Sequence, residues 1–222
     1  EKLKRGMQGN GYTPGFADSI YRQILGFGDY GFPESHSASF ALLVYCSAWL
    51  KCRHPAAFLA ALLNSQPMGF YSPSQLIQDA RRHGVEVRPA DAALSQWDCS
   101  MENGAGNDAK SSAVRLGLRM VGGLARAAAT RLVASRLHAS VEDLAQRAEL
   151  NRKDLKCLAA AGALQSLAGH RRNAHWAVSG VEKGSAFLPS EAGAADKIEF
   201  EPPGEGEEIV ADYQSLGFTL GR

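Results

Sequence analysis

A glycine-rich turn that runs directly into a polar cluster is the part of the sequence best suited to chemistry. The turn covers residues 28–33, the cluster is Ser35, His36 and Ser37, and an apolar stretch follows to residue 53. A turn that ends at a helix N-terminus points unbonded backbone N–H groups and the positive end of the helix dipole outward. The hydroxyls and the imidazole add side-chain donors. These residues predict a site for an anion such as phosphate; the alternative is an ordinary capped helix start.

A second candidate lies in residues 118–132, where two small residues flank an apolar one as Gly123-Leu124-Ala125. This pattern resembles a helix-hairpin-helix element, which binds DNA without reading its sequence. Glycine lets the backbone approach a phosphate, and the N–H groups of the following helix bond its oxygens. Ala125 stands where the pattern usually has a second glycine, and it carries a steric cost if that position needs a positive φ. An ordinary packing unit is the alternative.

A third group is basic: Lys153, Lys156, Arg171 and Arg172 follow the hairpin. These side chains predict contacts with the backbone of a duplex, and a solvated basic face is the alternative. Over the two later groups, the residues expected to bind DNA are Gly122, Gly123, Leu124, Arg126, Arg131 and Lys153.

The elements that hold these groups are mainly helical. Residues 35–53 are apolar almost all round, which predicts a buried helix. Alternation predicts a short strand over 85–89 and a hairpin that joins 97–102 to 113–118. From Val121 the sequence is again typical of helices. Residues 180–208 hold many acidic, Gly and Pro residues, which predicts a flexible linker.

Composition excludes several classes of function. The formal net charge of +1 gives no general attraction to nucleic acid or to a membrane, so any binding to DNA must come from local clusters. The 4 cysteines form no CxxC pair and indicate a reduced, cytoplasmic protein. No apolar stretch is long enough to span a membrane. No Asp-x-Asp pair falls on a predicted strand, so we expect no catalytic residue and no metal ligand in this chain.

The first candidate also carries a family resemblance. The run Tyr-Gly-Phe-x-x-Ser-His-Ser-Ala begins at Tyr30 and continues through Tyr45, Trp49 and Lys51 to His54-Pro55-Ala56. This sequence resembles that of the fingers domain of the bacterial C-family DNA polymerases, the replicative alpha-subunit family. Residues 62–73, Leu-Leu-Asn-Ser-Gln-Pro-Met-Gly-Phe-Tyr-Ser-Pro, are similar to the error-prone branch of that family.

The resemblance implies a mainly α chain that is an internal part of a longer protein. Residues 1–90 would be the C-terminal part of the fingers and 91–180 a β-hairpin with a helix-hairpin-helix region. Residues 181–208 would be a disordered linker and 209–222 the start of the next domain. The fingers would position the incoming nucleoside triphosphate, which makes Tyr30, Ser35, His36, Ser37 and Lys51 the expected nucleotide-binding residues.

The implied activity of the intact protein is error-prone, DNA-directed DNA synthesis on damaged templates, with Mg²⁺ bound by carboxylates outside this chain. The chain alone would be inactive. Its expected partners are template-primer DNA and deoxynucleoside triphosphates, and contacts with other mutagenesis or clamp proteins are left open. Two alternatives remain: a stand-alone DNA-binding module without sequence preference, and a protein-interaction segment of a mutagenesis complex.

Overall fold

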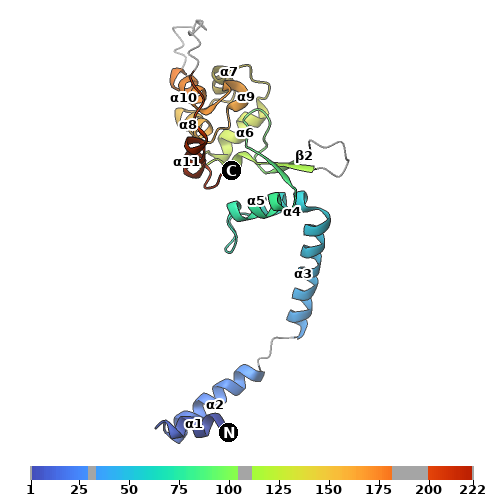
Figure 1. The fold of residues 1–222 in the computed structure, drawn as a ribbon, viewed down its shortest axis with the longest axis vertical. Helices are drawn as coiled ribbons and strands as arrows, with labels where there is room; N and C mark the ends of the chain where they lie inside the picture. Colours follow the sequence, from blue (N-terminus) through green and yellow to red (C-terminus); the bar gives the residue numbers. More distant parts are fainter. Residues whose placement is uncertain (1, 30–33, 105–111, 182–199, 222) are drawn as a thin grey trace. The chain divides into compact units, whose positions relative to one another are not determined.

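The computed structural model describes residues 2–29, 34–104, 112–181 and 200–221 (Figure 1). These residues form two compact units, Glu1–Cys52 and Arg53–Arg222. The second unit contains a small sheet and most of the helices. We describe each unit by itself.

The first unit contains three helices, α1 (Lys2–Gly9), α2 (Pro14–Asp29) and α3 (Glu34–Arg53). Pro14 occupies the first position of α2, where its missing N–H leaves no bond unmade, and the Thr13 hydroxyl accepts a hydrogen bond from the N–H of Phe16 at 3.4 Å. Helices α1 and α2 pack together around Ala17, which is fully buried. An ion pair of 2.6 Å between Lys4 and Asp18 lies on the surface of this pair.

Helix α3 is exposed on all sides, which corrects the prediction of a buried helix. Every described side chain from residue 36 to residue 53 is exposed, including Leu42 at 64% and Tyr45 at 69%. The helix is apolar all round, so burying it would require neighbours on every face. The described first unit provides only the α1–α2 pair besides α3, and that pair is too small to cover a helix of 20 residues.

The second unit begins with a helix pair, α4 (Pro55–Asn64) and α5 (Pro73–Arg82), that packs on the sheet. The sheet has the order β1-β3-β2, with β1 (Glu86–Arg88) parallel to β3 (Ser112–Arg115), and β2 (Ser100–Asn103) antiparallel to β3. The predicted strand and the predicted hairpin are both confirmed. Because α4 and α5 contact these strands, the boundary between compact units falls after residue 52 and not after residue 90, where the sequence placed a domain boundary.

Helices complete the second unit. After the short 3₁₀ turn η1 (Leu118–Met120), they are α6 (Arg126–Ala134), α7 (Val141–Arg147), α8 (Arg152–Ala160), α9 (Gln165–Ala168), α10 (Arg171–Gly180) and α11 (Glu205–Ser215). Fully buried leucines from the sheet and from these helices form one core, among them Leu116, Leu132, Leu144 and Leu158. The described chain therefore has the mainly α fold that the sequence predicts, with one small sheet.

The C-terminal segment belongs to this core, which corrects two of the expectations from sequence. Residues 200–208 do not behave as a linker, because Arg171 and Arg172 of α10 form ion pairs with Glu208 and Glu207, both at 2.7 Å. Helix α11 packs on α8, and Phe218 beyond it is only 1% accessible. Residues 209–222 are therefore part of the second unit. The remaining predicted linker, 182–199, lies outside the described residues.

Candidate nucleic-acid interface

The predicted hairpin is present and is built around one left-handed glycine. The turn runs from Val121 to Ala125 between η1 and α6. Gly123 adopts φ +80, a conformation that favours glycine, whereas Ala125 adopts φ −75 and ψ 139, which any residue reaches. The anticipated cost of alanine at this position is therefore absent.

Helix α6 begins without a side-chain cap. Ala125 is its N-cap residue and offers no hydrogen-bonding side chain, and Arg126 and Ala127 beside it are exposed. The first backbone N–H groups of a helix have no partner within the helix and carry the positive end of its dipole. This end of α6 can therefore accept an anion that approaches over Gly123.

Two of the predicted DNA-binding residues, Gly122 and Leu124, have structural roles. Leu124 is 8% accessible and anchors the turn in the core. The N–H of Gly122 donates a hydrogen bond of 2.8 Å to the carbonyl oxygen of Ser215, at the end of α11. That N–H is therefore not available to a phosphate.

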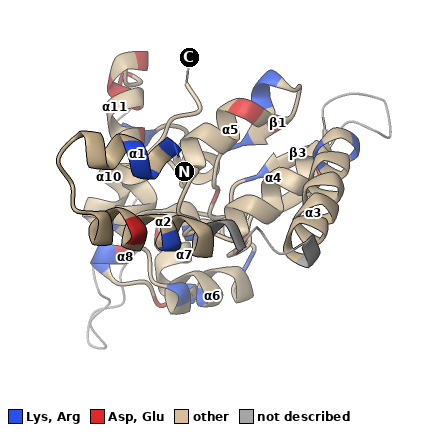
Figure 2. Cartoon of the chain, turned by 90° about the horizontal axis from the view of Figure 1, so that it is seen from below, with Lys and Arg blue, Asp and Glu red and all other residues tan. Residues whose placement is uncertain are grey.

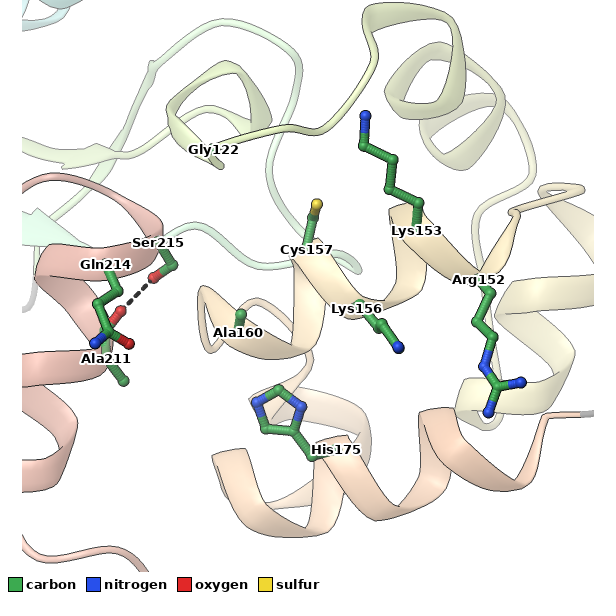
Figure 3. A pocket seen from close by; sticks show the side chains of 10 residues that line it. All are labelled: Gly122, Arg152, Lys153, Lys156, Cys157, Ala160, His175, Ala211, Gln214 and Ser215. Carbon is green, nitrogen blue, oxygen red and sulfur yellow. Dashed lines mark hydrogen bonds between the residues drawn. The ribbon is translucent and has the colours of Figure 1, made fainter.

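The hairpin lies directly against α8. A Cβ atom placed on Gly123 would be 3.1 Å from the Sγ atom of Cys157. Beside this contact is a pocket of about 640 Å³, drawn in Figure 3, whose lining comes from the hairpin and from α8, α10 and α11. The lining residues are Gly122, Arg152, Lys153, Lys156, Cys157, Ala160, His175, Ala211, Gln214 and Ser215.

The pocket is positively charged because α8 supplies three cations and no carboxylate lines it. Arg152, Lys153 and Lys156 are exposed, and within the described chain none of them forms an ion pair. Lys153 extends from α8 toward the hairpin (Figure 3). Burial, and then the nearby Arg171, lower the pKa of His175, so this imidazole is neutral at neutral pH and adds no charge.

A capping box fixes the start of α8, the helix that carries these cations. The Asn151 side chain accepts a hydrogen bond of 2.9 Å from the N–H of Asp154, and the Asp154 carboxylate accepts one of 3.4 Å from the N–H of Asn151. Asp154 is 3% accessible. The one acidic side chain in the first turn of α8 is thus occupied by the cap.

The predicted basic residues divide into two kinds. Arg126 is exposed, and its guanidinium lies over the ring of Trp97 at 5.9 Å from the centroid, where its N–H groups still face solvent. Arg131, also on α6, donates hydrogen bonds of 2.9 and 3.0 Å to the carbonyl oxygens of Ala148 and Glu149. Figure 2 shows the Lys and Arg positions along α6 in blue. Arg131 therefore satisfies the end of α7, and its role in DNA binding stays a prediction.

Arg171 and Arg172 also have structural roles. Arg171 pairs with Asp212 at 2.5 Å and with Glu208, and Arg172 pairs with Glu207. Of the four residues in the third basic group, Lys153 and Lys156 remain available to a phosphate.

The predicted nucleotide-binding residues are not all brought together. Tyr30 lies outside the described residues, and so does the side chain of Ser35. His36 and Ser37 are exposed in the first turns of α3, where the imidazole contacts the ring of Phe40 at 4.3 Å between centroids. Lys51 is near the other end of the same helix, about 21 Å further along its axis from Ser37 at 1.5 Å per residue. One small ligand cannot contact both His36 and Lys51 on this helix.

The described residues offer neither a metal-binding cluster nor a membrane-spanning helix. Within them there is no group of three or more His, Cys, Asp or Glu side chains that could hold a metal ion. Among the helices described, none is long and apolar enough to cross a membrane.

The sequence did not single out every residue of the pocket. The sequence pattern does not mark Arg152 as a binding residue, although it stands next to Lys153. Gln214 and His175 come from segments far apart in the chain, and only the packing of α10 and α11 on α8 places them there.

Comparison with known proteins agrees with this geometry. A family profile described as "Helix-hairpin-helix motif" matches residues 84–174. Proteins named "Error-prone DNA polymerase" match along the whole chain: those of Alkalilimnicola ehrlichii, an Azoarcus species and Methylococcus capsulatus are 56%, 55% and 52% identical. In each case the alignment covers 100% of this chain and 22%, 21% and 23% of the relative, so the chain spans about a fifth of the length of these curated relatives. This chain is therefore homologous, over all of its length, to one segment of the error-prone DNA polymerases, and that segment contains a helix-hairpin-helix region.

Proposed function

We propose that this chain is the part of an error-prone DNA polymerase that holds template-primer DNA by its phosphate backbone. The observation that carries the proposal is the set of unpaired cations on α8, Arg152, Lys153 and Lys156, of which Lys153 extends toward the hairpin that leads into the uncapped start of α6 (Figure 3). Cations and free N–H groups bind phosphate oxygens whatever the base sequence. Binding of this kind suits a polymerase, which must move along any template.

The activity of the intact protein follows from its relatives. We propose that it incorporates deoxynucleoside triphosphates opposite damaged templates and is cytoplasmic, and that His36 and Ser37 contact the nucleotide. The described residues do not fit Mg²⁺, because they offer no cluster of carboxylates. We therefore derive no step through a metal in this chain and expect residues elsewhere in the protein to bind it.

The test measures how binding depends on salt. The chain is titrated onto a fluorescent duplex at several salt concentrations, and log K is plotted against log [salt]. Each phosphate contact contributes about 0.9 to the slope, so the double variant Lys153→Ala/Lys156→Ala should lower the slope by about 2. Lys2→Ala, which removes one exposed charge from the first unit, should leave the slope unchanged.

Two further results decide among the candidates. A double variant with the wild-type slope would refute the assignment of α8 to the DNA interface. A primer-extension assay with the purified chain should show no incorporation, and metal-dependent extension by the chain alone would refute the claim that the catalytic carboxylates lie elsewhere.

A further inference from the structure

Phe70 is the most exposed large apolar side chain in the described part of the protein. It is 93% accessible, and its neighbour Tyr71 is 60% accessible. Both lie in the loop between α4 and α5. Single exposed apolar residues are common on protein surfaces, so exposure alone assigns no role to Phe70. The hydrogen bonds that hold the loop in place indicate a role for Phe70.

Hydrogen bonds fix the loop on both sides of Phe70. The Gln66 side chain accepts a bond of 2.9 Å from the N–H of Met68 and donates one of 3.1 Å to the carbonyl oxygen of Tyr71. Ser72 then caps α5 in a reciprocal capping box with Gln75. The ring of Phe70 is therefore presented to solvent by a preorganised backbone.

The base of the loop is attached to the hairpin. Arg119, in the 3₁₀ turn that leads into the hairpin, donates hydrogen bonds of 2.6 and 3.0 Å to the carbonyl oxygens of Asn64 and Gln66. The backbone N–H of Arg119 donates to Trp97, whose ring lies under the Arg126 guanidinium. A short series of direct contacts thus joins the aromatic loop to the start of α6.

We propose that Phe70, with Tyr71 beside it, stacks on an unpaired base of the template strand next to the duplex held by the hairpin and α8. This inference rests on the proposed function. Residues 65–72 contain no charged side chain, so the loop offers a phosphate no cation. Its aromatic rings offer flat apolar faces that match a nucleobase. Bases inside a duplex already stack on each other, which leaves unpaired bases as the ligand.

The experiment compares two probes with the whole 222-residue chain. One probe is a blunt duplex, and the other is the same duplex with a 5′ template overhang that carries 2-aminopurine at its first unpaired positions. Phe70→Ala should weaken binding to the overhang probe about tenfold, the loss typical of one stacking contact, and leave binding to the blunt duplex unchanged. The 2-aminopurine fluorescence that wild type quenches should recover in the variant.

Two matched variants separate stacking from general apolar contact. Phe70→Leu keeps an apolar side chain but removes the ring, so it should behave like Phe70→Ala. Leu137→Ala removes another highly exposed apolar side chain, 89% accessible, and should change neither probe.

The remaining outcomes overturn the inference in distinguishable ways. Equal losses on both probes would refute base stacking and assign Phe70 to the duplex that the probes share. No loss on the overhang probe would refute base stacking and point to a protein ligand for this loop. Wild type that binds both probes equally would refute the stacking while sparing the proposed function. Wild type that binds neither probe would refute both.

Discussion

Gly122 and Gly123 are adjacent in the hairpin but should respond differently to the same substitution. A Cβ atom on Gly122 would lie 2.6 Å from the backbone oxygen of Ser215, whereas one on Gly123 would meet the Cys157 Sγ atom at 3.1 Å. A backbone carbonyl within a packed segment moves much less readily than a single side-chain atom. We therefore expect Gly122→Ala to be the more damaging change.

The expected loss of unfolding free energy in Gly122→Ala has two sources. The clash forces the hairpin and the end of α11 apart, which costs about 1–3 kcal/mol in an overpacked site. The 2.8 Å hydrogen bond from the N–H of Gly122 to Ser215 is weakened with it, at about 1 kcal/mol. The free energy of unfolding should fall by about 2–4 kcal/mol.

The expected loss of unfolding free energy in Gly123→Ala is set by the backbone conformation at this position. At φ +80 an alanine carries a left-handed penalty of about 1–2 kcal/mol. The Cys157 side chain is half-buried, and its Sγ atom can give way by a small rotation. The loss of unfolding free energy in Gly123→Ala should therefore be close to this conformational penalty.

Urea unfolding measures both variants. Trp97 and Trp176 report on the second unit, and a Trp49→Phe background removes the tryptophan of the first unit. The unfolding midpoints should rank wild type above Gly123→Ala and Gly123→Ala above Gly122→Ala. If Gly122→Ala unfolds at the wild-type midpoint, or if Gly123→Ala is the less stable variant, the contact between the hairpin and α11 does not have the role assigned to it.

Three more changes test other parts of the second unit. Arg171→Leu leaves two carboxylates without the buried cation they share, so the unfolding free energy should fall by about 3–5 kcal/mol in urea, and an unchanged midpoint would contradict this. Hydrogen bonds from Arg115 lower the pKa of Glu102, so its contribution is present above about pH 4.3 and is lost as pH falls through the folded pKa. Glu102→Gln should flatten the pH dependence of stability in that range, as measured by urea titrations at successive pH values. Burial raises the pKa of the Cys99 thiol, so iodoacetamide should modify exposed Cys46 first, which mass spectrometry can follow; equally fast modification of Cys99 would show that the core opens readily.

The local elements were predictable because their patterns are local. Alternation over residues 85–89 and the two arms of the hairpin gave β1, β2 and β3. The small-apolar-small pattern at Gly123 located the turn, although only the backbone angles show that Ala125 needs no special conformation.

The sequence predictions differ from the structure where contacts between distant parts of the chain determine the role of a residue. Arg131 and Arg171 resemble DNA-binding residues in sequence, but their partners lie 17 and 41 residues away, at the end of α7 and on α11. The acidic, Gly-rich composition of residues 200–208 indicated a linker, because the cations that pair with Glu207 and Glu208, in the first turn of α11, belong to the distant helix α10. The apolar pattern of α3 correctly gave a helix, whereas its burial depends on surfaces that the first unit does not provide.

The hydrogen bond between Gly122 and Ser215 gives the C-terminal segment influence over the hairpin turn and, through that turn, over the start of α6. If that segment detaches, the carbonyl that receives the hairpin N–H leaves with it, and so does Phe218 from the core. The cations of α8 would remain in place while the turn beside them lost its support. A protease cut or a bound partner near residue 215 would therefore alter the surface that we propose to bind a duplex without removing a single positive charge.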